Sequence, residues 1–485
     1  MSNDKTFETL DPENWDEMRS LAHKMVDDAV DYLETVRDKP VWQPVPQAIK
    51  DTFKSGLPIE PDDPAAVYED FLTNIFPYPM GNIHPRFWSW YMGNGTIMGA
   101  LADLMAATMN PNMAAGNHAA MMVEGQVLNW MKQVVGLPAD ASGLLVSGGS
   151  MANLVGLTIA RNTLAAGNVR KHGVQSLDKR LTVYASTEVH SCNQRALELL
   201  GLGSDSLRKI EVNDDYTINL EKLKSTIDED IQSGFQPICI IATSGTINTG
   251  AIDDLHAIAD LCEKHDIWFH VDGAIGAIAM LSDTVRPLLT GIERADSIAL
   301  DLHKWMHVPF EASCVLVRDE KAHRDTFSLT PEYLEHAERG LASGPAWFSE
   351  YGVQLSRSFR ALKIWMTMKE HGSKKLGRMI SRNVDQAQYL GRLIEKTEHL
   401  ELVAPIGLDI VCYRYNPGET DLQTLNHLNR EIMMELQEQG IAAPSYTTLN
   451  EKYCIRVAIA NHRSRYEDFD LLIESTIRIA QSVTT

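Results

Sequence analysis

The sequence predicts an α/β fold with a mostly parallel sheet, followed by a smaller α+β region and preceded by a helical segment. Three observations carry this prediction. Short apolar stretches alternate with helix-like stretches through the middle of the chain, the pattern changes near residue 376, and an isolated amphipathic stripe precedes both. At 485 residues the chain is too long for one compact core. We expect an N-terminal helical segment (1–98), a large α/β domain (99–375) and a small α+β domain (376–485).

The N-terminal segment carries one amphipathic helix. Asp11-Pro12 predicts its start, because Asp caps helices and Pro suits a first turn. Apolar residues then follow at helical spacing: Met18, Leu21, Met25, Ala29 and Leu33. A solitary amphipathic helix cannot bury its own stripe, so we expect it to pack on another subunit or domain.

The middle of the chain contains six candidate strands, several of them separated by helical stretches such as 150–166 and 254–266. Strands that alternate with helices favour parallel pairing. The candidate strands are 143–149, 181–186, 237–246, 267–274, 297–302 and 313–319. After residue 376 the order becomes helix, strand (408–415), helix (421–440), strand (453–460) and helix, which is typical of an α+β domain.

Composition narrows the possible partners and compartment. The net charge of −21 argues against nucleic acid and anionic membranes, and no apolar run approaches the ~20 residues of a membrane span. The acidic, polar start is unlike a targeting signal. Six scattered cysteines without a CxxC pair argue against a metal site or disulfide framework. We therefore expect a cytoplasmic protein without a structural metal.

The carboxyl ends of parallel strands are where open α/β sheets bind ligands. The strand 143–149 runs into the small residues of Ser147–Ser150 and then a helix, which favours an anion such as phosphate. An ordinary turn remains the alternative. The stretch matches neither GxGxxG nor GxxxxGKS, which disfavours dinucleotide and P-loop binding.

Titratable residues stand at the ends of three other strands. Asp272 follows apolar residues in a strand, where a carboxylate needs a cationic or hydrogen-bonding partner. Lys304 lies between His303 and Trp305 at the end of the next strand, and His190 lies beyond the strand 181–186. The alternatives are a lysine that reaches the surface and a histidine that caps a helix.

A phosphate site, a buried carboxylate and a lysine together match one cofactor. Pyridoxal 5′-phosphate carries a phosphate, a flat ring, a pyridine nitrogen and an aldehyde that condenses with lysine. Lys304 could then be buried because it is held as a Schiff base, not as an ammonium. Asp272 would keep the pyridine nitrogen protonated, which makes the ring an electron sink.

An ordered set of motifs resembles the group II pyridoxal-phosphate decarboxylases, close to the aromatic-L-amino-acid decarboxylases. The motifs are NIHPRFWSW (82–90), SGGSMANLVGL (147–157), STEVHSC (186–192), ATSGTINTGAIDDL (242–255), WFHVDGAIG (268–276), DLHKW (301–305), LTPEYLEH (329–336), SRSFRALKIW (356–365) and YCIRVAI (453–459). The resemblance implies a type I aminotransferase-like fold and an obligate homodimer. It also implies active sites at the subunit interface and N-terminal helices that wrap the partner.

The resemblance also implies roles for individual residues. Lys304 matches the Schiff-base lysine, Asp272 the pyridinium partner and His190 the histidine stacked on the ring. Phosphate-contacting and ring-contacting positions fall on Gly149, Ser150, His303 and Thr246. Two positions depart from the family pattern. Cys192 stands where a hydroxyl is common, and Asp301, where asparagine is also found, is left out of the phosphate set because a carboxylate would repel the phosphate.

Tyr333 bears on the product. It falls on the position of the decarboxylases' Cα proton donor, in a segment that reads as a closing loop. Related aldehyde synthases carry phenylalanine there, so the tyrosine favours an amine and CO2 over an aldehyde. The aldehyde synthase remains the first alternative. A catalytically inactive dimeric scaffold is the second, and the joint presence of Lys304, Asp272 and His190 argues against it.

Substrate preference is predicted from three residues. The aromatic side chains Phe87 and Trp88 suit an indole, phenol or catechol pocket, with dimer-interface packing as the alternative. Arg456 lies on a strand where the family often supports the substrate carboxylate; a purely structural arginine is the alternative. Tryptophan, tyrosine, phenylalanine and their hydroxylated forms all remain open as substrates.

Overall fold

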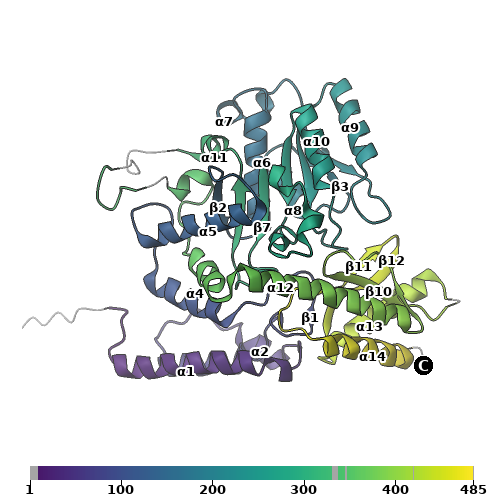
Figure 1. Ribbon diagram of the computed structural model, residues 1–485. Helices are drawn as coiled ribbons and strands as arrows, with labels where there is room; N and C mark the ends of the chain where they lie inside the picture. The colour runs from purple at the N-terminus through teal and green to yellow at the C-terminus, as the bar shows by residue number, and fades with distance from the viewer. Residues whose placement is uncertain (1–8, 330–336, 345–346, 419, 484–485) are drawn as a thin grey trace, which may run out of the picture.

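The computed structural model describes residues 9–329, 337–344, 347–418 and 420–483. Its larger sheet has seven strands in the order β2-β8-β7-β6-β5-β3-β4 (Figure 1). Only β8 runs antiparallel to its neighbours, which confirms the mostly parallel sheet. The strands are β2 (Ser142–Val146), β8 (Ser313–Val317), β7 (Ser297–Asp301), β6 (Trp268–Asp272), β5 (Gln236–Thr243), β3 (Leu181–Ser186) and β4 (Leu207–Ile210).

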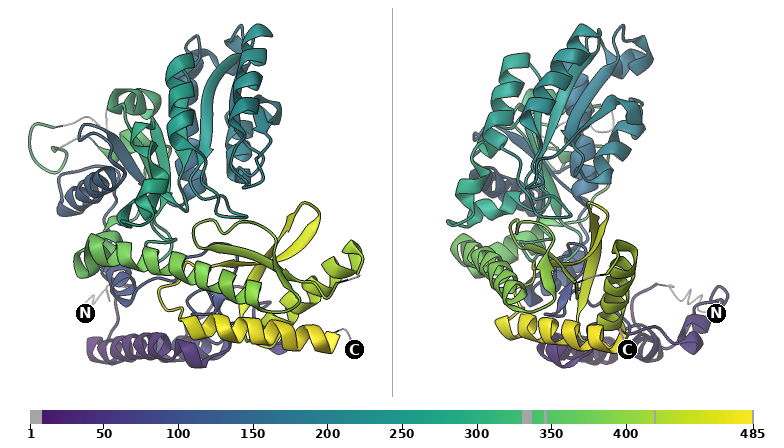
Figure 2. Two further views of the ribbon diagram at one scale, coloured as in Figure 1. Left: turned by 45° about the vertical axis from the view of Figure 1, so that its right-hand side comes forward. Right: turned by 90° about the vertical axis from the view of Figure 1, so that its right-hand side faces the viewer.

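Helices cover both faces of this sheet (Figure 2). Neighbouring residues of one strand therefore enter different cores: Ile240 lies in one apolar cluster and Ile241 in the other. This double burial explains why the strands read as continuous apolar runs. The helices of this region are α5 (Ala119–Val135), α6 (Gly149–Leu164), α7 (Val169–His172), α8 (Ser191–Leu199), α9 (Leu220–Gln232), α10 (Leu255–His265) and α11 (Glu320–Phe327).

The smaller sheet has the order β1-β11-β12-β10-β9, and helices α12, α13 and α14 belong to the same region. Its first strand comes from the N-terminal segment and pairs in parallel with β11, a pairing that sequence patterns missed. Its elements are β1 (Phe87–Trp88), β9 (Leu400–Leu402), β10 (Ile410–Tyr415), β11 (Ala443–Leu449), β12 (Lys452–Ala458), α12 (Ala361–Lys396), α13 (Leu422–Glu438) and α14 (Tyr466–Val483). Helix α12 is kinked at Gly372 and crosses the predicted limit at 375/376, so the domain limits stay a prediction.

The N-terminal segment contains α1 (Trp15–Glu34), α2 (Gln47–Thr52) and α3 (Pro64–Asn74), followed by α4 (Ile97–Met109). The predicted start of α1 at Asp11-Pro12 is wrong. Asn14 caps the helix instead, because its side-chain oxygen accepts from the N–H groups of Asp16 and Glu17 at 3.0 and 3.3 Å. No residue of α1 is buried.

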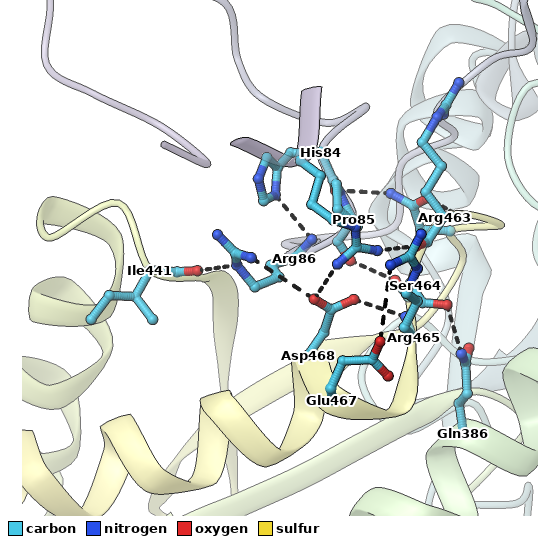
Figure 3. A network of polar contacts seen from close by, with 12 residues as sticks. His84, Pro85, Arg86, Gln386, Ile441, Arg463, Ser464, Arg465, Glu467 and Asp468 are labelled. Carbon is cyan, nitrogen blue, oxygen red and sulfur yellow. Dashed lines mark hydrogen bonds and ion pairs between the residues drawn. The ribbon is translucent and has the colours of Figure 1, made fainter. Parts of the chain in front are cut away.

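A polar network joins the N-terminal segment to the start of α14 (Figure 3). The Asp468 carboxylate is 3% exposed and accepts from Arg37 at 2.7 Å, while Arg86 lies 3.9 Å away. Ser464 Oγ donates to the carbonyl of Pro85 at 2.5 Å. These contacts hold the segment that carries β1 against the small sheet. Among the described residues, no helix has the length and apolar character to cross a membrane.

Candidate active site

A cavity of about 240 Å³ lies at the carboxyl ends of β5, β6 and β7. Six residues predicted from sequence line it together: Gly149, Ser150, His190, Asp272, His303 and Lys304. They come from four stretches of chain far apart in sequence, which the parallel sheet brings to one edge. Helix α6 packs against both α8 and β7 (Figure 1).

One wall of the cavity is the N-terminus of α6. Its N-cap is Gly148, which has no side chain to satisfy the first N–H groups. A Cβ added to Gly149 would lie 3.0 Å from Asp301 Oδ2 and 3.2 Å from the Cβ of Ala274, so any larger residue would crowd these two side chains. A sixteen-residue helix with free N–H groups facing a cavity favours an anion such as phosphate.

Asp272 is the last residue of β6 and is 4% exposed. Its Oδ2 atom accepts a hydrogen bond from the side-chain amide of Asn193 at 2.8 Å. The backbone N–H of Ala274 lies 3.4 Å from Oδ1. The carboxylate is therefore held within the sheet edge while it still borders the cavity.

Lys304 stands in the turn after β7, and its Nζ lies 2.9 Å from Asp301 Oδ2. The nitrogen therefore points to a buried carboxylate and does not reach along the surface. Burial alone raises the pKa of Asp301, but Lys304, His303 and the hydroxyl of Ser313 outweigh it and bring that pKa below its usual value. The neighbouring Trp305 is fully buried and donates to Asn383 Oδ1 at 3.0 Å, which ties the turn to α12.

The N-terminal segment closes the back of this turn. A Cβ added to Gly93 would lie only 1.7 Å from the carbonyl oxygen of His303. Residue 93 therefore has to be glycine for the two backbones to pack this closely.

Both cavity histidines are neutral at pH 7. His190 caps α8, and its Nδ1 accepts from the N–H of Cys192 at 3.3 Å, which leaves the proton on Nε2. His303 Nδ1 accepts from the N–H of Ala312 at 3.1 Å in the same way. Burial lowers the pKa of each ring below 6.5, although nearby carboxylates oppose the shift.

A buried hydrogen-bond chain runs inward from the cavity wall, which Asn153 and Cys192 help to line, and sequence analysis missed it. The His270 ring lies between Ser297 Oγ at 2.7 Å and Asn153 Oδ1 at 2.8 Å, and the Asn153 amide donates to the sulfur of Cys192 at 3.4 Å. Burial lowers the pKa of His270 to about 4 and raises that of Cys192 to about 12, so both are neutral. Helical spacing offered a signal: Asn153 follows Gly149 by four residues.

Two groups of predicted residues lie elsewhere. Thr246 does not line the cavity; its hydroxyl lies 3.0 Å from that of Thr249, although Gly245 and Ile247 on either side do line it. Phe87 and Trp88 do not line it either. Trp88 stacks on Phe469 with ring centroids 5.0 Å apart, and Phe87 packs in a separate apolar cluster. Both aromatic side chains are thus buried against other apolar residues of the chain and do not face the cavity.

Arg456 and Tyr333 complete the predicted set. Arg456 is buried and donates to the carbonyl of Asn248 and the hydroxyl of Ser445, both at 3.1 Å, and to the carbonyl of Trp90. It does not line the cavity, but its Nη2 atom has no hydrogen-bond partner among the described residues. Tyr333 lies outside the described residues.

Comparison with known proteins identifies the family. The model of the pyridoxal-dependent decarboxylase conserved domain matches residues 46–416. The chain belongs to this family. The decarboxylase is 34% identical over 473 residues to the aromatic-L-amino-acid decarboxylase of Bacillus atrophaeus, covering 97% of this chain and 96% of the relative. It is also 28% identical to phenylacetaldehyde synthase of Arabidopsis thaliana, covering 93% of each chain.

The fold comparison agrees. The crystal structure of Oryza sativa TDC with PLP and tryptamine matches the decarboxylase with a TM-score of 0.90 and 26% identity, over 98% of this chain and 100% of that chain. The decarboxylase therefore has the type I fold and pyridoxal 5′-phosphate as its cofactor.

The residues that line the cavity match the chemical groups of this cofactor. The uncapped α6 terminus suits the phosphate, the Asp272 carboxylate suits a protonated ring nitrogen, and Lys304 supplies the amine. The hydroxyls of Thr243 and Ser244 are buried near the site without a hydrogen-bond partner among the described residues. Such unpaired groups are expected where a polar ligand belongs.

Proposed function

We propose that this decarboxylase removes the α-carboxylate of an aromatic L-amino acid and releases the amine and CO2. One observation carries the proposal: Lys304, Asp272 and the N-terminus of α6 converge on a single cavity. The aromatic preference is supported by the Bacillus atrophaeus relative, which spans nearly the whole chain.

Pyridoxal 5′-phosphate, when bound, supplies a π-system that accepts the electrons of the broken Cα–carboxylate bond. Lys304 Nζ would hold it covalently, and the backbone of Gly149 with Ser150 and His303 would hold its phosphate. Asp272 would place a negative charge at the ring nitrogen. The neutral ring of His190 would pack on the cofactor's face without adding positive charge.

Proton delivery to Cα is assigned to Tyr333, by resemblance. General acid catalysis by a positioned side chain contributes roughly 10²–10⁴-fold to a rate. This assignment separates the amine-forming reaction from the aldehyde synthase alternative. Thr246, Phe87, Trp88 and Arg456 stay proposed as cofactor-contacting or substrate-contacting residues, and the unpaired Nη2 of Arg456 supports a role toward a carboxylate.

We also propose a homodimer with active sites at the interface. Helix α1 buries none of its residues in its own chain and exposes Trp15, Met25 and Val30. Helix α4 exposes Leu104 and Met105. Apolar side chains displayed on two elements are typical of a surface that a second copy covers. Sedimentation velocity should give a mass near twice the 54.1 kDa of one chain.

The proposed compartment is the cytoplasm. All six cysteines are free thiols, which supports a reducing environment. The charge of −21 supports small-molecule substrates in preference to nucleic acid or anionic membranes.

A product assay tests the proposed reaction. Purified protein with pyridoxal phosphate would be given L-tryptophan, L-tyrosine, L-phenylalanine, L-DOPA and, as an acidic control, L-glutamate. CO2, amine, aldehyde and keto acid are scored separately, with Lys304→Ala as the inactive control. We expect amine and CO2 in equal amounts from an aromatic substrate only. Aldehyde with ammonia as the main products would instead identify an aldehyde synthase, and turnover of glutamate alone would overturn the aromatic assignment.

A further inference from the structure

Asn193 is a fully buried polar residue just beyond the cavity wall. It lies on α8, three residues after His190, with no side-chain exposure. Its amide nitrogen donates to Asp272 Oδ2 at 2.8 Å and lies 3.5 Å from the carbonyl oxygen of His190. Since both neighbours can only accept, the nitrogen is the atom that faces them.

The other end of the same amide has no partner. Asn193 Oδ1 is buried without a hydrogen bond among the described residues. A buried unpaired oxygen costs stability, and an apolar side chain of similar size would avoid that cost. The asparagine is therefore not explained by packing, whereas its contact with Asp272 gives it a use.

The contact fixes one oxygen of a carboxylate that has two. Asn193 donates to Oδ2, whereas the one hydrogen bond to Oδ1 from the described part of the chain is the long contact from Ala274 N–H at 3.4 Å. A hydrogen bond from an amide also stabilises the negative charge of a carboxylate. Asn193 thus holds the plane of Asp272 and leaves Oδ1 as the atom available to a cationic partner.

We propose that Asn193 is a positioning residue, which orients Asp272 so that the carboxylate meets the ring nitrogen of the cofactor. The inference rests on the proposed function, because it takes Asp272 as the partner of that nitrogen. It adds that a side chain of α8, which does not contact the cofactor itself, orients the carboxylate that pairs with the ring nitrogen.

A pair of cofactors tests the role without relying on activity. One is pyridoxal 5′-phosphate; the other is its 1-deaza analogue, in which C–H replaces the ring nitrogen. Dissociation constants are measured by equilibrium dialysis for the parent, Asn193→Leu and Asn193→Ala. We expect each variant to bind pyridoxal phosphate about tenfold more weakly, the loss typical of one charge-assisted hydrogen bond. Binding of the deaza analogue should stay unchanged, since it has no nitrogen to pair.

The same helix offers a matched control. Gln194 also donates its side-chain amide to a carboxylate, that of Glu198 at 2.9 Å, but on the exposed side of α8. Gln194→Leu should alter the binding of neither cofactor. Melting temperatures measured without cofactor show whether each variant folds. Two substitutions of Asn193 are used so that the test still works if one of the two variants does not fold.

Two results for the Asn193 variants would count against the inference. An equal loss for both cofactors would make Asn193 a merely structural residue, and no loss for either would remove the role. Asp272→Asn separates this failure from that of the proposed function. If Asp272→Asn discriminates between the cofactors and the Asn193 variants do not, only the positioning role fails. If Asp272→Asn does not discriminate, the pairing of Asp272 with the ring nitrogen fails as well.

Discussion

Lys304 Nζ lies 2.9 Å from Oδ2 of Asp301, which stands three residues earlier as the last residue of β7. The lysine is only partly enclosed, with 20% of its side chain exposed, whereas the aspartate is 3% exposed. The buried partner thus fixes where the reactive nitrogen stands, and the open side of the lysine faces the cavity.

Borohydride reduction tests Lys304 as the site of the covalent link. Reduction of the cofactor-loaded enzyme should attach the pyridoxyl group to Lys304, as read by peptide mapping. Lys363 is the matched control, because it is also ion-paired, with Asp103 at 3.0 Å, but is buried outside the cavity. Lys363→Met should keep the label and Lys304→Ala should lose it; a label on any other lysine would refute the assignment.

Tyr333→Phe tests the proton donor. The variant should bind cofactor and substrate and still release CO2, but amine formation should fall about 10²–10⁴-fold without the hydroxyl. The unprotonated carbon can then react with O2, so aldehyde, ammonia and peroxide should form in air. The measurement is the amine-to-aldehyde ratio under air and under argon. Amine production at the parent rate, with no aldehyde in air, would assign the proton to another group.

Asp409→Asn tests a buried carboxyl behind the site. Asp409 accepts from the hydroxyl of Tyr91 at 2.8 Å, and burial raises its pKa from 3.8 to about 7, with the Tyr91 hydrogen bond and Arg456 opposing. Between pH 4 and 7 the unfolded chain is ionised at Asp409 while the folded chain keeps the proton. Each pH unit in that window therefore costs the folded state about 1.4 kcal/mol.

Asparagine removes this pH dependence. Relative to the parent, Asp409→Asn should gain about 2 kcal/mol between pH 5 and pH 7 and no more above about pH 7. Urea denaturation at four pH values checks the slope. Tyr91→Phe, which keeps the carboxyl, should still lose stability as the pH rises from 5 to 7, and the loss should continue to higher pH because the Tyr91 hydrogen bond that lowers the pKa of Asp409 is gone. Parallel pH profiles for parent and Asp409→Asn would show that Asp409 is ionised throughout.

Asp468→Asn tests the attachment of the N-terminal segment seen in Figure 3. The change leaves Arg37 and Arg86 without their shared, buried counter-charge, and breaking such a pair typically costs about 3 kcal/mol. We expect a lower urea midpoint and faster proteolysis ahead of β1. Glu467→Gln is the control, because its pair with Arg465 is exposed at 4.0 Å. Equal midpoints for the two variants would show that the network contributes nothing.

Six of the seven strands of the large sheet were predictable, because burial on both faces gives continuous apolar runs in the sequence. Strand β4 was not among the expected strands, and its two central residues are not buried. The strand 181–186 coincides with β3 in full, and its residues are buried throughout. The strand β1 was not predictable: two residues show no periodicity, and their partner β11 lies more than 350 residues later. The start of α1 was predicted at the wrong residue, because two nearby residues can cap a helix. Asn14 caps it, and Asp11 does not.

The site divides in the same way. Three site residues could be predicted, because their types are unusual at their positions in the sequence. Glycine begins a helix at Gly149, a carboxylate ends an apolar strand at Asp272, and a lysine follows another apolar strand at Lys304. Asn193 carries no such signal. Asparagine is ordinary in a helix, and only the packing of α8 against the sheet turns its amide toward Asp272.

The close packing of Gly93 against His303 means that the turn carrying Lys304 depends on residues outside the predicted large domain of residues 99–375. Residues before 99 pack directly against the backbone of the lysine turn. A methyl group at position 93 would occupy the same space as the carbonyl oxygen of His303. A shortened chain that begins at residue 99 would keep every residue that lines the cavity. It would nevertheless lose Gly93, whose backbone packs against the carbonyl oxygen of His303 next to Lys304, so we expect truncation or exchange of the N-terminal segment to disturb the lysine turn.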